Sequence, residues 1–111
     1  MFYLQKTMEI SGSHKLKLNY DSPCSRVHGH NWMVTVYCKS DKLDENGMIV
    51  DFSKIKKVVF ALDHEHINDH VTFNPTAELL AEWICARVPS CYKVDVEETK
   101  NNVATYVRDD A

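Results

Sequence analysis

Two histidines separated by a single glycine, His28 and His30, open an apolar, β-branched segment that continues to Cys38. If that segment is a strand, both imidazoles point to the same face, because side chains alternate along a strand. His14 ends the preceding strand-like segment, where pairing of the two strands would bring it across to them. Three imidazoles with one open position form the ligand set of a catalytic zinc ion. The competing interpretation is that these histidines are ordinary polar residues.

Cys24 lies four residues before His28. A free thiol has a pKa near ~8.5 and is a poor base at neutral pH, but a nearby metal ion or imidazolium lowers that pKa. By position alone, the cysteine is a fourth metal ligand, a catalytic base or a bystander.

Two further features place carboxylates where they can do chemistry. Asp63 directly precedes His64, and an aspartate next to a histidine can fix one tautomer or stabilise the imidazolium. A charged helix end is the competing interpretation of that pair. Glu98 continues the apolar face of a strand over residues 92–98, so its carboxylate needs a partner there or ends the strand in solvent.

Several short blocks of the sequence occur in the order that is typical of one enzyme family. They are residues 24–30, 47–52, 62–64, 68–69, 74–78 and 96–99. On these blocks the chain resembles the 6-pyruvoyltetrahydropterin synthase superfamily. Within it, the chain is most similar to the bacterial 6-carboxytetrahydropterin synthases of queuosine and 7-deazapurine biosynthesis.

The resemblance implies a role for each reactive side chain. It implies a Zn²⁺ ion as cofactor, held by three histidines, which are His14, His28 and His30. Cys24 would be the catalytic base, and Asp63 with His64 would act opposite it from a neighbouring subunit.

The resemblance also implies a pterin-binding carboxylate. Glu98 would accept the two N–H donors of the guanidine-like pterin edge, for which a carboxylate is well suited. Thr76 and Glu78 would lie near the pterin, although helix capping is a sufficient explanation for both.

The implied reaction converts 7,8-dihydroneopterin triphosphate to 6-carboxytetrahydropterin with loss of triphosphate and acetaldehyde. This choice of product rests on the short gap between Cys24 and His28. The first alternative is a 6-pyruvoyltetrahydropterin synthase, which keeps the three-carbon side chain. Aldolase-like relatives replace the cysteine that is present here. An alternative from another class is a non-catalytic zinc- or pterin-binding module, in which Cys24 completes a closed zinc site.

Composition limits the remaining function classes. The 111 residues indicate one domain, 1–111, and a hydrophobic share of 44% argues against disorder. A net charge of -3 gives no support to nucleic-acid binding. We find no signal sequence and no apolar run long enough for a membrane span, so we expect a cytoplasmic protein that contacts no membrane. Its thiols should then be reduced, with Cys38, Cys85 and Cys91 buried as small apolar groups.

The pattern predicts two strands, two helices and two further strands, over residues 2–13, 32–38, 52–63, 75–88, 92–98 and 103–107. Asp51 is the expected cap of the first helix, Pro75 the expected first residue of the second, and residues 65–73 a polar connection. The result is an α+β fold, a four-stranded antiparallel sheet in ββααββ order with two helices on one face. In the family that the chain resembles, this fold is called the tunnelling fold (T-fold). The subunits of that family join into a barrel, as a trimer or a dimer of trimers (a homohexamer), with shared active sites.

Overall fold

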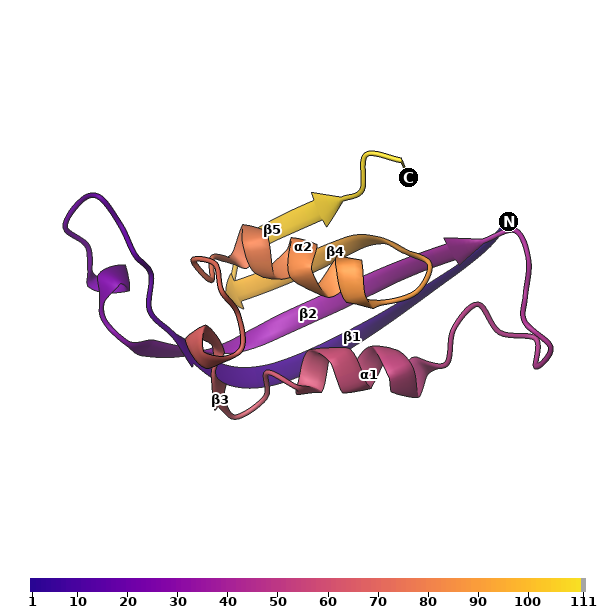
Figure 1. Ribbon diagram of the computed structural model, residues 1–111, viewed down its shortest axis with the longest axis horizontal. Coiled ribbons are helices and arrows are strands. Elements are labelled where there is room, and N and C mark those ends of the chain that lie inside the picture. Colours follow the sequence, from indigo (N-terminus) through magenta and orange to yellow (C-terminus); the bar gives the residue numbers. More distant parts are fainter. Residues whose placement is uncertain (111) are drawn as a thin grey trace.

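The computed structural model describes residues 1–110 and has an α+β fold built on one mixed sheet (Figure 1). The strand order across the sheet is β3-β1-β2-β4-β5. The strands are β1 (Phe2–His14), β2 (His28–Ser40), β3 (Glu65–His66), β4 (Cys91–Thr99) and β5 (Asn102–Val107). Helix α1 (Phe52–Phe60) packs along β1, and helix α2 (Ala77–Arg87) packs across β4 and β5. Neither helix is long and apolar enough to cross a membrane.

The prediction of a four-stranded antiparallel sheet was wrong in one respect, because β3 adds a fifth strand that runs parallel to β1. Glu65 pairs with Gly12 in this short ladder. The chain turns into it at His64, whose φ of 58° is left-handed and whose N–H donates to Ser11 O at 2.6 Å. A side chain at Gly12 would approach Ile67 to 3.2 Å, so glycine leaves room for the segment that follows β3.

The long β1–β2 ladder aligns the predicted histidines. It pairs His14 with His28 and Gly12 with His30. These pairs form because β2 begins at His28, four residues before the strand expected from the sequence. Alternate residues of both strands face the helices and form the core, among them Met8, Ile10, Trp32, Val34 and Val36.

Both helices begin with a side-chain cap. Asp51 accepts a hydrogen bond from Ser53 N at 2.8 Å, as predicted, although α1 ends at Phe60 and is followed by a turn. Thr76 caps α2 by accepting from Leu79 N at 3.2 Å, so Pro75 precedes the cap and is not the first helical residue.

Helix α2 buries only some of its large apolar side chains. Leu80 and Ile84 are buried, whereas Leu79 is 38% exposed. The small side chains of Ala77, Ala81 and Cys85 take the remaining buried positions of the helix.

An irregularity in the β2–β4 pairing moves Tyr92 to the other face of the sheet. The register shifts between Tyr37 and Cys38. The Tyr92 ring then contacts the rings of Tyr37 and Tyr3, at centroid distances of 6.4 and 6.2 Å. It therefore lies on the face of the sheet opposite to Val94. The prediction that Tyr92 shares the face of Glu98 was therefore wrong. Three buried cysteines carry free thiols, as expected, and they are Cys38, Cys85 and Cys91.

Candidate metal centre and active site

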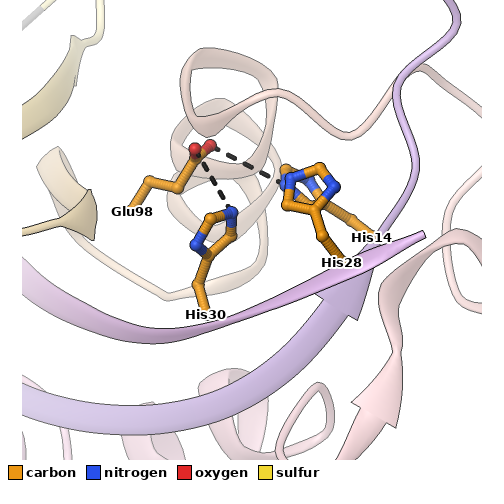
Figure 2. A group of neighbouring side chains, drawn as sticks. All are labelled: His14, His28, His30 and Glu98. Atoms are coloured by element: carbon orange, nitrogen blue, oxygen red, sulfur yellow. Dashed lines mark ion pairs between the residues drawn. The ribbon is translucent and has the colours of Figure 1, made fainter. Parts of the chain in front are cut away.

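The three predicted histidines and Glu98 meet at one end of the sheet (Figure 2). One ligand atom from each of His14, His28, His30 and Glu98 lies within 4.8 Å of the others. His14 ends β1, the other two histidines begin β2, and Glu98 comes from β4. The β4–β5 register shifts between Glu97 and Thr99, so Glu98 lies at an irregular point of the ladder where its side chain reaches the histidines.

Backbone carbonyls orient two of the imidazoles. His14 Nδ1 lies 2.8 Å from Pro75 O, and His28 Nδ1 lies 2.7 Å from Arg26 O. A carbonyl oxygen can only accept, so each Nδ1 carries the proton and each Nε2 keeps a free lone pair. This arrangement, in which a ligand's second ring nitrogen is hydrogen-bonded, is usual around protein-bound metals.

Two of the Nε2 atoms have unmet bonding capacity. His14 Nε2 and His30 Nε2 are buried and have no hydrogen-bond partner among the residues described. One Glu98 oxygen lies 3.8 Å from His14 Nε2 and the other lies 3.3 Å from His30 Nε2. A buried polar atom without a partner is rare in proteins. Three imidazoles with a carboxylate are donors that suit zinc, so the residues present fit a metal ion.

Burial also favours the neutral form of two of the imidazoles, those of His14 and His30. It lowers the pKa of His14 and of His30 below the ordinary value of 6.5, although the Glu98 carboxylate opposes the shift. Neutral imidazole is the form that binds metals, so the cluster is prepared for a cation at neutral pH.

Cys24 lies beside this cluster in sequence but outside its group of four ligand atoms. It is half-buried on the β1–β2 connection, within a 3-10 turn over Pro23–Ser25. The Ser22 side chain accepts from Cys24 N at 3.2 Å, and Leu16 N donates to Cys24 O at 3.0 Å. The fourth ligand atom grouped with the three histidines thus belongs to Glu98. In the closed zinc site considered from the sequence, Cys24 would have been the fourth ligand.

Asp63 and His64 form the contact that their adjacency suggested. His64 Nδ1 lies 2.9 Å from Asp63 Oδ2, and Ser11 N donates to Asp63 Oδ1 at 2.9 Å. That backbone hydrogen bond lowers the pKa of Asp63, so the carboxylate stays ionised beside the imidazole. The His64 side chain is 81% exposed. It lines a cavity of about 470 Å³ together with Ser13 and other residues near the start of β2.

The structure separates the two residues of the second helix that the sequence grouped together. Glu78 shares a pocket of about 270 Å³ with Glu98 and with Val103. The Thr76 hydroxyl oxygen instead accepts from the backbone of α2. Capping therefore accounts for the threonine, while Glu78 stays a candidate for contact with a ligand.

Sequence reasoning missed the supporting groups. The carbonyl oxygens of Pro75 and Arg26 have no side-chain signature, so no residue pattern could have assigned them to the histidines. The approach of Glu98 to His14 and His30 was also missed, although the irregular end of β4 makes it possible.

The fold and the site together define an α+β protein with a histidine-rich, metal-type centre at one end of its sheet. A family model described as 6-pyruvoyl tetrahydropterin synthase matches residues 3–109. The chain belongs to the 6-pyruvoyl tetrahydropterin synthase family.

Relatives within the family are similar over most of the chain. The chain is 36% identical to the 6-carboxy-5,6,7,8-tetrahydropterin synthase of Bacillus subtilis, covering 95% of this chain and 84% of the relative. It is 35% identical to the enzyme of the same name from Synechocystis, covering 96% and 93%. Among solved structures, the 6-pyruvoyl tetrahydropterin synthase of Caenorhabditis elegans matches with a TM-score of 0.76 and 26% identity, over 96% of this chain and 95% of that one. The five-stranded sheet with two helices is thus the T-fold architecture of this family.

Proposed function

We propose that the protein is a zinc-dependent 6-carboxy-5,6,7,8-tetrahydropterin synthase acting on 7,8-dihydroneopterin triphosphate. The observation that carries the proposal is the gathering of His14, His28 and His30, with two free Nε2 atoms, in a chain whose bacterial relatives have this name. The products would be 6-carboxytetrahydropterin, acetaldehyde and triphosphate, for use in queuosine or 7-deazapurine biosynthesis.

The three histidines hold the zinc ion in this proposal. When bound, zinc supplies a Lewis acid that acidifies the hydroxyl and neighbouring C–H groups of the substrate side chain. Cys24 accepts a proton from that side chain as the thiolate, the form that a nearby metal ion favours. Its side chain is half-buried and only four residues from His28.

His64 exchanges protons on the other side of the substrate. Its Nδ1 faces the Asp63 carboxylate and therefore carries a proton, which leaves Nε2 free to give or take one. The Asp63 carboxylate, which stays ionised, holds the His64 ring in this orientation.

Glu98 anchors the pterin. Its carboxylate is 25% exposed and lines the same pocket as Glu78, so it can meet a ligand as well as the histidines. A pterin presents two parallel N–H donors, and a carboxylate accepts both at once.

A second copy of the chain completes the site in this proposal. Within one chain His64 is exposed and lines a cavity that includes neither Cys24 nor Glu98. The β5 edge carries Val103 and Val107, which are 54% and 50% exposed. A trimer or a dimer of trimers that covers such edges would supply His64 to the Cys24 of a neighbour.

The test is incubation of the purified protein with 7,8-dihydroneopterin triphosphate, followed by mass analysis. We expect 6-carboxytetrahydropterin and an equal amount of acetaldehyde. A product that keeps its three-carbon side chain, without acetaldehyde, would instead identify a 6-pyruvoyltetrahydropterin synthase. Zinc-loaded protein that leaves the substrate unchanged would point to the non-catalytic binding module.

A further inference from the structure

Two asparagine side chains hold the segment that follows β1. Asn68 Oδ1 accepts from Lys15 N and its Nδ2 donates to Lys15 O, both at 2.9 Å. Asn74 makes the same pair of hydrogen bonds to Lys17. Its Oδ1 accepts from Lys17 N at 2.8 Å and its Nδ2 donates to Lys17 O at 3.0 Å. Four hydrogen bonds thus join one short stretch of backbone to two amides more than fifty residues away in the sequence.

The two amides take the place of a neighbouring strand. In an extended chain the N–H and C=O groups of residues two apart point to the same side, which is the side where Asn68 and Asn74 lie. A primary amide offers one acceptor and a donor in one plane, as a peptide unit does. Leu16, between the two held residues, points its N–H the other way and donates it to Cys24 O at 3.0 Å.

This arrangement connects Cys24 to the metal centre. His14 directly precedes the held segment, and Asn74 directly precedes Pro75, whose carbonyl orients His14. The turn around Cys24 is formed locally by Ser22, so its internal shape does not depend on the asparagines. Its position relative to His14 depends on the Leu16 bond, and hence on where the amides hold the segment.

Packing alone does not fix the segment. Leu16 and Phe73, on the two sides of the amide bonds, line a common cavity of about 560 Å³. Since space remains between the two stretches, the hydrogen bonds of Asn68 and Asn74 account for much of the attachment.

We propose that Asn68 and Asn74 are positioning residues that hold Cys24 at its working distance from the three-histidine centre. Neither amide reaches the reacting atoms, because each bonds to the backbone of the held segment. The catalytic meaning of this role rests on the proposed function, in which Cys24 moves a proton. The physical claim, that the amides restrain Cys24, can be tested without turnover.

The first test measures the reactivity of Cys24 towards iodoacetamide in the intact protein. The other three thiols are at most 2% exposed, so alkylation of the folded protein reports on Cys24. Asn68→Ala and Asn74→Ala should each speed alkylation roughly thirtyfold, because two hydrogen bonds of ordinary net strength shift an opening equilibrium by about that factor. Hydrogen exchange at Leu16 N–H should speed up with it.

Matched variants separate positioning from general loss of structure. Asn46→Ala removes an exposed amide in the loop between β2 and α1 and should change neither rate. Asn68→Asp and Asn74→Asp keep the shape and the acceptor but lose the donor, so they should change both rates in the same direction as alanine does. Each asparagine variant should keep its metal and remain folded, and should lower kcat with little change in KM.

The results that overturn the proposal are specific. Wild-type alkylation and exchange rates in both alanine variants would show that the amides do not restrain Cys24. Reactivity of the buried thiols together with that of Cys24 would show a structural role only. Faster alkylation of Cys24 in a protein that makes no pterin product would support the restraint and would contradict the proposed function alone.

Discussion

Glu98 Oε1 lies 3.3 Å from His30 Nε2, so a carboxylate expected to bind a pterin also contacts a metal-type histidine. The other oxygen, Oε2, lies 3.8 Å from His14 Nε2. A cation between the imidazoles would take over both of these nitrogen lone pairs. Glu98 therefore has two candidate roles, as a fourth ligand of a metal ion or as the carboxylate that binds the pterin.

Replacing Glu98 by glutamine separates the two roles. If the carboxylate binds the pterin, Glu98→Gln should keep the bound metal and weaken pterin binding about tenfold or more, since a charge-assisted pair of hydrogen bonds is lost. Metal analysis and titration with the pterin measure the two effects. Glu97→Gln is the matched control, because Glu97 pairs with Met33 and belongs neither to the group of ligand atoms nor to the lining of the Glu98 pocket. Loss of the metal in Glu98→Gln would make Glu98 a ligand.

The histidines are tested by single substitution. The protein as purified should contain about one zinc per chain, and His28→Ala or His30→Ala should lose most of it, because two imidazoles bind zinc far less tightly than three. His70→Ala serves as control, since His70 Nε2 contacts Glu65 at 3.1 Å and lies outside the cluster. Full zinc content in both of the first two variants would refute the assignment.

The strands that carry the site could be predicted from the sequence, whereas the supporting contacts could not. Alternation in β2 and the spacing of His28 and His30 indicate a common face, and the ladder with β1 brings His14 opposite. A two-residue strand such as β3 leaves no periodic signal. Its pairing depends on the left-handed turn at His64. The sequence does not predict such a turn, because a left-handed backbone is expected at glycine and not at histidine.

Which side chains of β4 share a face could not be predicted from the sequence either. Alternation predicted that Tyr92 and Glu98 share a face, but one extra residue in the pairing with β2 moves the tyrosine across the sheet. Bulges arise from the pairing of two strands and not from either strand alone. The position of Glu98 beside His30 likewise depends on an irregular β4–β5 register that no single segment encodes.

Sharing of the active site between chains is tested by mixing two variants. Cys24→Ala should keep its zinc and lose turnover, and His64→Ala should be inactive as well. Mixing them under conditions that exchange subunits should restore part of the activity, because some sites then pair an intact Cys24 with an intact His64. No recovery despite proven exchange would place both groups within one chain, and a fully active monomer would contradict sharing altogether.

The stability of the metal-free protein should depend on pH in a defined direction. Burial lowers the pKa of His14 and His30 below 6.5 in the folded chain. The unfolded chain, with ordinary histidine pKa values, binds more protons below that pH, so the free energy of unfolding falls as the pH drops through about 6.5. Urea unfolding of chelator-treated protein at pH 7.5 and at pH 5.5 measures the change. A free energy of unfolding that is equal or larger at the lower pH would contradict the prediction.

The most direct measurement follows product formation as zinc is returned to metal-depleted protein. Acetaldehyde and 6-carboxytetrahydropterin are measured together after each addition, with 7,8-dihydroneopterin triphosphate as substrate. We predict no turnover without metal, then equal amounts of both products, rising with zinc until about one ion per chain is bound. Full activity in the metal-free protein, or a product that retains the three-carbon side chain, would contradict the account.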